Sequence, residues 1–247
     1  MKKSKVKVDV AVSGRQRRKF LKLGGLALAG SGLLIACGDD DDINIPEGGM
    51  DDVFDLGSGD RGVLNYAYAL EQLEAAFYTN VVNNMYSGAS TVERTLMQDL
   101  YNHEVNHREF FKAALNANFN ADQVLPEMLE FDFSSVDFSN RAQVLGTARL
   151  LEDTGVGAYN GAAKYLNTGA FLTLAGKIVS VEARHAAAIR TLIAGDGSFL
   201  DNDPYKSFAG DDIVDDNGLD AAMEPSDVIR AAGSFFVTPF SYNNPQG

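Results

Sequence analysis

Two pairs of glutamate and histidine carry the strongest chemical signal in this sequence. Glu104 precedes His107 by three positions, and Glu182 precedes His185 by the same spacing. Residues three apart on an α-helix lie on one face, about 5 to 6 Å from each other, so each pair can converge on one ion. The chain has only 3 histidines, so two such pairs are unexpected by chance.

Two single glutamates complete a repeated pattern. Glu71 lies seven residues before Tyr78, and Glu152 lies seven residues before Tyr159. A Glu-x-x-His pair begins 33 residues after the first of these glutamates and 30 residues after the second. The sequence therefore indicates one helical hairpin used twice, each copy supplying two carboxylates and one imidazole.

Carboxylate oxygens combined with imidazole nitrogens suit iron or manganese better than a metal that prefers thiolates. Four buried carboxylates would balance two divalent cations, whereas each one left without a positive partner would cost several kcal/mol. Glu71 and Glu152 would either bridge the two ions or cap them. We therefore predict two ions of iron or manganese, held by Glu71, Glu104, His107, Glu152, Glu182 and His185.

Neighbouring residues have alternative interpretations, and no catalytic side chain is assigned among them. Glu74 is either a carboxylate that supports the ligands or a partly exposed helix residue. Tyr78 and Tyr159 either hydrogen-bond the ligands, carry an electron, or simply fill the core. His103 is expected at the surface, because adjacent helix residues point roughly 100° apart. A bundle without metal is the alternative for the whole set, its acids paired with Arg108, Arg149 or Arg184.

Helices must position these side chains. Apolar residues recur at helical spacing over 63–85, 91–115, 140–166 and 168–193. Short turns near Gly88 and Asn167 join these segments in pairs, while the irregular stretch 116–139 separates the pairs. The pattern predicts an all-α four-helix bundle with one long crossover, followed by a short helix over 225–232. Gly155 and Gly157 are unusual in a helix interior and leave the straightness of the third helix open.

With these six residues in place, the sequence over roughly 60–195 resembles the ferritin-like superfamily of di-metal carboxylate proteins. The segments 70–78 and 224–229 are similar to exported ferritin-like proteins related to plant desiccation-associated proteins. This resemblance implies a ferritin-like bundle and a dinuclear site with the six residues as ligands. It implies no substrate.

The N-terminal residues have the pattern of an export signal. Nine basic residues precede an apolar run over 23–36, which as a helix would be too short for a roughly 30 Å hydrocarbon core. Arg17 and Arg18 resemble a twin-arginine signal, and Leu34 to Cys37 resembles a lipoprotein cleavage site. We expect a signal peptide over 1–36 and lipid on Cys37, which would place the protein on the extracytoplasmic side of a bacterial envelope.

Charge limits the partners of the protein. The chain carries 21 basic and 34 acidic residues, a net charge of −13, which excludes nucleic acid as a ligand. After removal of the signal, 12 basic and 33 acidic residues remain. The acids concentrate in an expected tether over 37–60 and a C-terminal extension over 196–247, which flank the bundle over 61–195. The predicted partners are a membrane, reached through the lipid, and a small oxidant, with a homo-oligomer left open.

Two classes of function are compatible with this pattern. One is a di-metal oxidoreductase that oxidises Fe(II) or removes peroxide, because two adjacent redox metals can deliver electrons together. The other is a non-enzymatic stress or surface protein, whose bundle is held structurally with or without metal. Iron storage in a closed shell is disfavoured, because a tether and a lipid anchor would obstruct the assembly.

Overall fold

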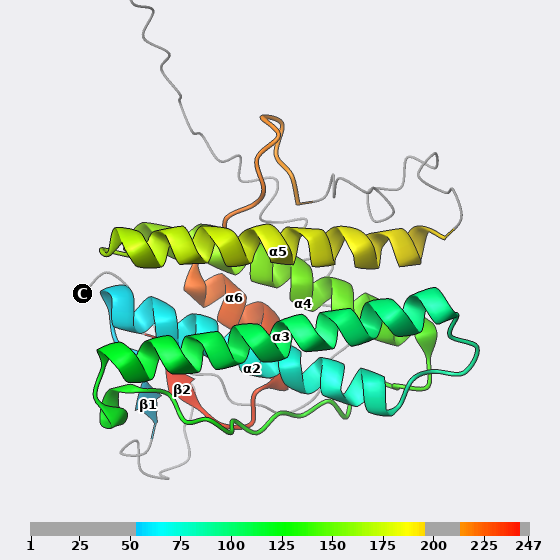
Figure 1. Ribbon diagram of the computed structural model, residues 1–247, viewed down its shortest axis with the longest axis horizontal. Coiled ribbons are helices and arrows are strands. Elements are labelled where there is room, and N and C mark those ends of the chain that lie inside the picture. The colour runs from blue at the N-terminus through cyan, green and yellow to red at the C-terminus, as the bar shows by residue number, and fades with distance from the viewer. Residues whose placement is uncertain (1–52, 196–212, 243–247) are drawn as a thin grey trace, which may run out of the picture.

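The computed structural model describes residues 53–195 and 213–242, and helices dominate it (Figure 1). The predicted signal peptide and Cys37 lie outside the described residues. The long helices are α2 (Gly59–Asn83), α3 (Thr91–Asn118), α4 (Arg141–Ala162) and α5 (Gly169–Ala194), followed by the short α6 (Pro225–Ala232). The shorter elements are β1 (Phe54–Asp55), β2 (Phe240–Ser241) and the 3-10 turns η2 (Ala121–Gln123), η3 (Ala163–Tyr165) and η5 (Gly233–Phe235). The predicted all-α bundle with one long crossover and a short C-terminal helix is confirmed.

The first hairpin pairs α2 with α3. Gly88 lies in the turn between them with a φ of 79°, a conformation that favours glycine. Ser90 then caps α3, because its hydroxyl accepts a hydrogen bond from the Glu93 backbone while the Glu93 carboxylate accepts one from the Ser90 backbone. The Glu93 carboxylate also contacts Arg141 at 2.6 Å, which ties the start of α3 to the start of α4.

The second hairpin pairs α4 with α5 through η3 and the turn that follows it. Asn140 caps α4 by accepting hydrogen bonds from the backbone of Ala142 and Gln143. At the other end, the Asp60 carboxylate of α2 accepts a 2.6 Å hydrogen bond from the Thr168 hydroxyl, and it also accepts one from the Asn167 backbone. Each hairpin is thus held to the other near its ends.

The crossover from 119 to 140 is fastened to α2 by two buried amide side chains. Asn65 donates to the Gln123 carbonyl and accepts from the backbone of Leu125. In the same way, Gln72 donates a hydrogen bond to the Pro126 carbonyl and accepts one from the backbone N–H of Leu129. Phenylalanines at 131, 133 and 138 pack with one another and with rings at 77, 235 and 236. The phenylalanine-rich crossover therefore forms a second apolar layer beneath the bundle.

The segment before α6 packs closely on α4. The Met223 backbone N–H donates to the Gly157 carbonyl at 2.9 Å, and a Cβ at Gly157 would lie 2.8 Å from the Met223 side chain. A Cβ at Gly161 would overlap the Met223 backbone. Gly157 and Gly161 therefore make room for this segment, and α4 is continuous over Arg141–Ala162. Beyond α6, β2 pairs in parallel with β1 and brings the two ends of the described chain together.

Among the helices that the structure describes, none combines the length and apolar character needed to cross a membrane.

Candidate metal centre

The four long helices bring the six predicted ligands together at their midpoints. Glu71 comes from α2, Glu104 and His107 from α3, Glu152 from α4, and Glu182 and His185 from α5. All four glutamates are fully buried, and His185 is buried with them. The helical stripes predicted to face the core therefore do so, and each delivers its ionisable groups to the same place.

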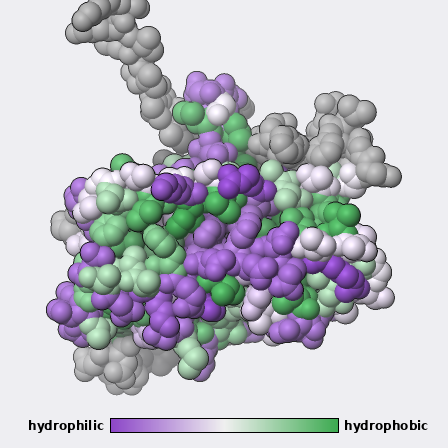
Figure 2. Space-filling model, viewed as in Figure 1, coloured by the Kyte–Doolittle hydropathy of each residue, from purple (hydrophilic) through white to green (hydrophobic). Residues whose placement is uncertain are grey.

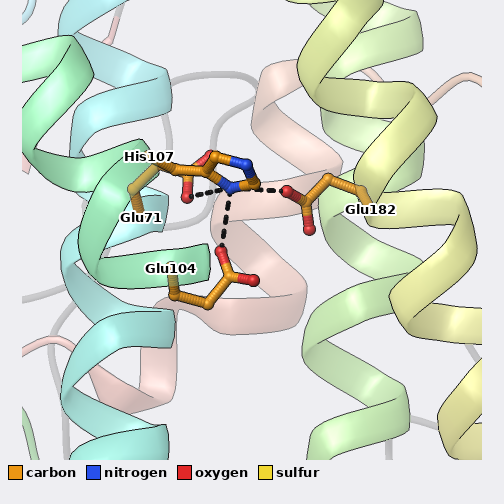
Figure 3. A group of neighbouring side chains, drawn as sticks. All are labelled: Glu71, Glu104, His107 and Glu182. Carbon is orange, nitrogen blue, oxygen red and sulfur yellow. Dashed lines mark hydrogen bonds and ion pairs between the residues drawn. The ribbon is translucent and has the colours of Figure 1, made fainter. Parts of the chain in front are cut away.

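One group of side chains surrounds His107 (Figure 3). The Nδ1 atom of His107 lies 2.9 Å from Glu182, 3.2 Å from Glu104 and 3.4 Å from Glu71. The three carboxylates arrive from α2, α3 and α5, so one imidazole nitrogen faces oxygens from three helices. Three oxygens and one nitrogen converging in this way match the donor types of an iron or manganese site.

A second group surrounds His185 in the same manner. Its Nδ1 atom lies 2.8 Å from Glu104, 3.3 Å from Glu152 and 3.5 Å from Glu182. Glu104 and Glu182 belong to both groups, each using one oxygen in either group, whereas Glu71 and Glu152 belong to one group each. Glu104 and Glu182 are therefore shared between the two groups, as bridging ligands would be, whereas Glu71 and Glu152 each stand in one group, as capping ligands would.

Whether metal ions fit these residues depends on whether the buried ligand atoms already have hydrogen-bond partners. Five buried carboxylate oxygens in the cluster, as well as Nδ1 of His185, have no hydrogen-bond partner. Glu104 and His185 approach to 2.8 Å, yet this contact lacks the direction of a hydrogen bond. Buried polar atoms are nearly always paired. Atoms that point toward shared centres instead of toward each other are what ligands of two cations require.

Two tyrosines connect the halves of the cluster crosswise. The Tyr78 hydroxyl of α2 donates a 2.5 Å hydrogen bond to Glu152 on α4. The Tyr159 hydroxyl of α4 donates to Glu71 on α2. Both rings are buried, and burial is the largest cause that raises the pKa of each hydroxyl. Each capping carboxylate is therefore held by a protonated tyrosine from the other half of the repeat, as one of the sequence interpretations proposed.

Histidine protonation balances the carboxylates when metal is absent. Burial lowers the pKa of His107 and His185, but the surrounding carboxylates outweigh burial and raise both values well above the usual range. Burial likewise raises the pKa of Glu104, and it raises that of Glu152 to about 7. Burial acts on Glu182 too, but the close contacts with the two positively charged imidazoles prevail and lower its pKa to about 2. The two imidazolium ions therefore offset carboxylate charge in the metal-free cluster.

Glu74 is a fifth carboxyl at the centre. It is only 3% exposed, which excludes the partly exposed helix residue. Burial first, and then the charges of Glu182 and Glu104, raise its pKa well above the usual range. It faces Gly155 of α4, where a Cβ would lie 3.3 Å from Glu74 Oε1. Glu74 stands beside the two ligand groups without belonging to either.

His103 differs from its prediction in one respect. It is exposed, as expected, and hydrophilic side chains gather on the face between α3 and α5 (Figure 2). However, its Nδ1 atom lies 2.9 Å from Nε2 of His185, and the two rings stack at 5.1 Å between centroids. The surface prediction is confirmed, but it did not include this contact, because His185 belongs to a different helix. The helical periodicity of α3 could not predict this contact, because it carries no information about residues of α5.

In the metal-free alternative, arginines pair with the buried acids of the cluster. Two of the three arginines proposed for this role have other partners. Arg108 pairs with the exposed Glu109, and Arg184 donates to the Ser180 hydroxyl. The buried Arg190 pairs with Asp153 at 2.6 Å, which joins α4 to α5. In the described part of the chain, the ion pairs of the four cluster glutamates are with His107 and His185.

The comparison with known families agrees with this geometry. A family model described as a ferritin-like domain matches residues 59–195. This range contains the four long helices and all six converging side chains. No curated protein matches the chain significantly.

Proposed function

The chain belongs to the family of ferritin-like domains, and on that premise we propose that it is a dinuclear iron or manganese protein that oxidises Fe(II) or removes peroxide. One observation carries the proposal most directly. Two groups of buried ligand atoms share Glu104 and Glu182, so that two ions held there would be neighbours. Neighbouring redox metals supply two electrons to dioxygen or a peroxide when they are bound.

Different residues of the site would hold the ions and keep their ligands in position. Glu104 and Glu182 would hold both ions, while Glu71 and Glu152 would each hold one. Tyr78 and Tyr159 hold those two carboxylates by donating hydrogen bonds to them. Full burial of the four glutamates excludes bulk water from the reacting centre, which strengthens every electrostatic interaction within it.

The proposal is tested by oxygen-dependent and peroxide-dependent turnover of Fe(II) by the purified protein. We expect turnover in the wild type and in Glu109→Gln, which changes an exposed glutamate of α3. We expect turnover to fall to background in Glu104→Gln combined with Glu182→Gln. Metal binding without turnover in the wild type would contradict the enzymatic proposal and favour the non-enzymatic stress or surface protein.

Export and lipid anchoring are the second part of the proposal. They rest on the basic and apolar N-terminal sequence that ends at Cys37. Cys37 would be the first residue of the mature chain and would carry the lipid. In a bacterial host, Cys37→Ser should move the protein from membrane to soluble fractions. An unmodified Cys37 inside a longer mature chain, found by mass spectrometry, would refute this part.

A further inference from the structure

The internal repeat relates one half of the centre to the other, but two positions break its symmetry. Four pairs match across the repeat, namely Glu71 with Glu152, Tyr78 with Tyr159, Glu104 with Glu182, and His107 with His185. The residue three places after the capping glutamate is Glu74 in the first half and Gly155 in the second. The residue before the bridging glutamate is His103 in the first half and Val181 in the second.

The first difference acts on His185 alone. His103 lies 2.9 Å from Nε2 of His185, the nitrogen that points away from the carboxylates. A neutral His103 can accept the Nε2–H of His185, which leaves Nδ1 free of a proton and directed at the cluster. Within the described part of the chain, no side chain makes an equivalent hydrogen bond to Nε2 of His107. The valine at position 181 has no polar atom with which to make one.

The second difference adds a fifth carboxyl on the same side. The point where a Cβ of Gly155 would stand is 3.3 Å from Glu74 Oε1 and 3.8 Å from Glu182 Oε2. That Glu182 oxygen is the one that faces His185, at 3.5 Å. The missing side chain at Gly155 therefore gives Glu74 its place, next to the group that contains Glu152 and His185. A cation bound there would favour the ionised form of the Glu74 carboxyl, so Glu74 would stabilise an ion at that position.

We propose that the two metal positions are unequal, and that the position formed by Glu152 and His185 is filled first and more tightly. His103 is a positioning residue that orients His185, and Glu74 reinforces the same position. This inference rests on the proposed dinuclear function. Hydrogen bonds to a ligating histidine typically change metal affinity by about 10- to 100-fold, so the two binding steps should be separated by about that factor.

Titration of the metal-free full chain with Mn²⁺ alone, followed by native mass spectrometry and calorimetry, tests the inference. At one equivalent, the wild type should be mostly a one-ion species. Glu71→Gln should bind one ion with the affinity of the first wild-type step, and Glu152→Gln should bind one ion about 10- to 100-fold more weakly. Equal affinities in these two variants would overturn the inference.

Variants of the symmetry-breaking residues show which groups cause the inequality. His103→Ala should weaken the first step by about 10- to 100-fold, and Glu74→Gln should weaken it in the same direction. His103→Gln, which keeps a hydrogen-bond acceptor, should recover part of the loss. Val181→His, which places an imidazole at the matching position of α5, should strengthen the second step. An unchanged first step in His103→Ala, with folding verified by circular dichroism, would refute the positioning role.

The failure of the inference is distinguishable from that of the proposed function. Wild-type protein that binds no Mn²⁺ or Fe²⁺ would contradict the dinuclear function itself. Two ions that bind with equal affinities would leave the dinuclear function standing and overturn only the inequality.

Discussion

Sharing of carboxylates is the main property of the centre at the scale of single residues. Glu104 and Glu182 each face both imidazoles, whereas Glu71 and Glu152 each face one. The cost of losing a carboxylate should therefore depend on which of the two kinds it is. The spacing of the four glutamates in the sequence does not distinguish these two kinds.

The number of ions lost on substitution should follow this sharing. Glu104→Gln or Glu182→Gln should remove most of both ions, because each change removes a donor from both groups. Glu71→Gln or Glu152→Gln should leave about one ion per chain. Elemental analysis of purified protein measures the ratio, with Glu109→Gln as the control on α3. Identical losses in all four variants would mean that no carboxylate is shared.

The protonation of the same residues predicts how pH affects the metal-free protein. Burial raises the pKa of Glu152 from 4.5 to about 7, so the unfolded chain releases this proton first as pH rises. That difference alone lowers the free energy of unfolding by about 3 kcal/mol between pH 4.5 and 7. The raised pKa values of His107 and His185 act in the same direction above their unfolded value near 6.5. Below pH 4.5 the lowered pKa of Glu182 reverses the trend.

Urea unfolding in the presence of a chelator measures this dependence. The midpoint should be highest near pH 4.5 to 5 and should fall toward pH 8. Glu152→Gln should flatten the decline between pH 5 and 7, because that carboxyl no longer titrates. A metal-free protein whose stability rises from pH 5 to pH 8 would contradict the protonation described for this cluster.

At the scale of elements, α4 serves two partners at once. One side of the helix presents Glu152 and Tyr159 to the candidate metal centre, and Gly157 and Gly161 receive the segment around Met223. Gly155 accommodates Glu74 of α2. The small residues of α4 therefore permit close approach, and the lower helical propensity of glycine is the cost of that contact.

Alanine substitutions in α4 should distinguish the effect of close packing on the free energy of unfolding from the effect of helical propensity. Gly161→Ala should lower the free energy of unfolding by about 1 to 3 kcal/mol, because the new methyl group would overlap the Met223 backbone. Gly146→Ala is the control on the same helix, since nothing lies within 4 Å of its Cβ position. It should be neutral or stabilising by about 0.4 to 1 kcal/mol. Equal effects of the two changes in urea unfolding would contradict the docking of the Met223 segment on α4.

At the scale of the whole molecule, the candidate metal centre is the place where the two hairpins meet. Each hairpin contributes three of the six ligands, so two bound ions would join α2 and α3 to α4 and α5. The tyrosine hydrogen bonds cross the same boundary in both directions. Occupancy of the site should therefore be coupled to global stability.

Metal should stabilise the folded protein at neutral pH. A hundredfold excess of Fe²⁺ or Mn²⁺ over its dissociation constant adds about 2.7 kcal/mol, which for a chain of this size raises the melting temperature by about 5 to 10 °C. This gain should disappear on acidification, because protons then compete for the ligands. Melts by calorimetry at pH 7 and pH 5, with metal or with chelator, test this coupling. Identical melts at pH 7 in all conditions, including Glu104→Gln with Glu182→Gln, would exclude a metal that joins the hairpins.

The helices and the ligand types could be read directly from the sequence, because helical periodicity is local and places Glu104 with His107, and Glu182 with His185, on inward faces. The match between two halves of one chain also revealed both capping glutamates. Contacts between helices could not be read in this way, because they depend on how far and at what angle the helices approach. Tertiary packing alone decided that Glu104 and Glu182 are shared, that each tyrosine crosses to the opposite half, and that His103 reaches His185. Tertiary packing also explained the glycines at positions 155, 157 and 161 of α4. The space left by a missing side chain can be interpreted only when the residue that occupies this space is known.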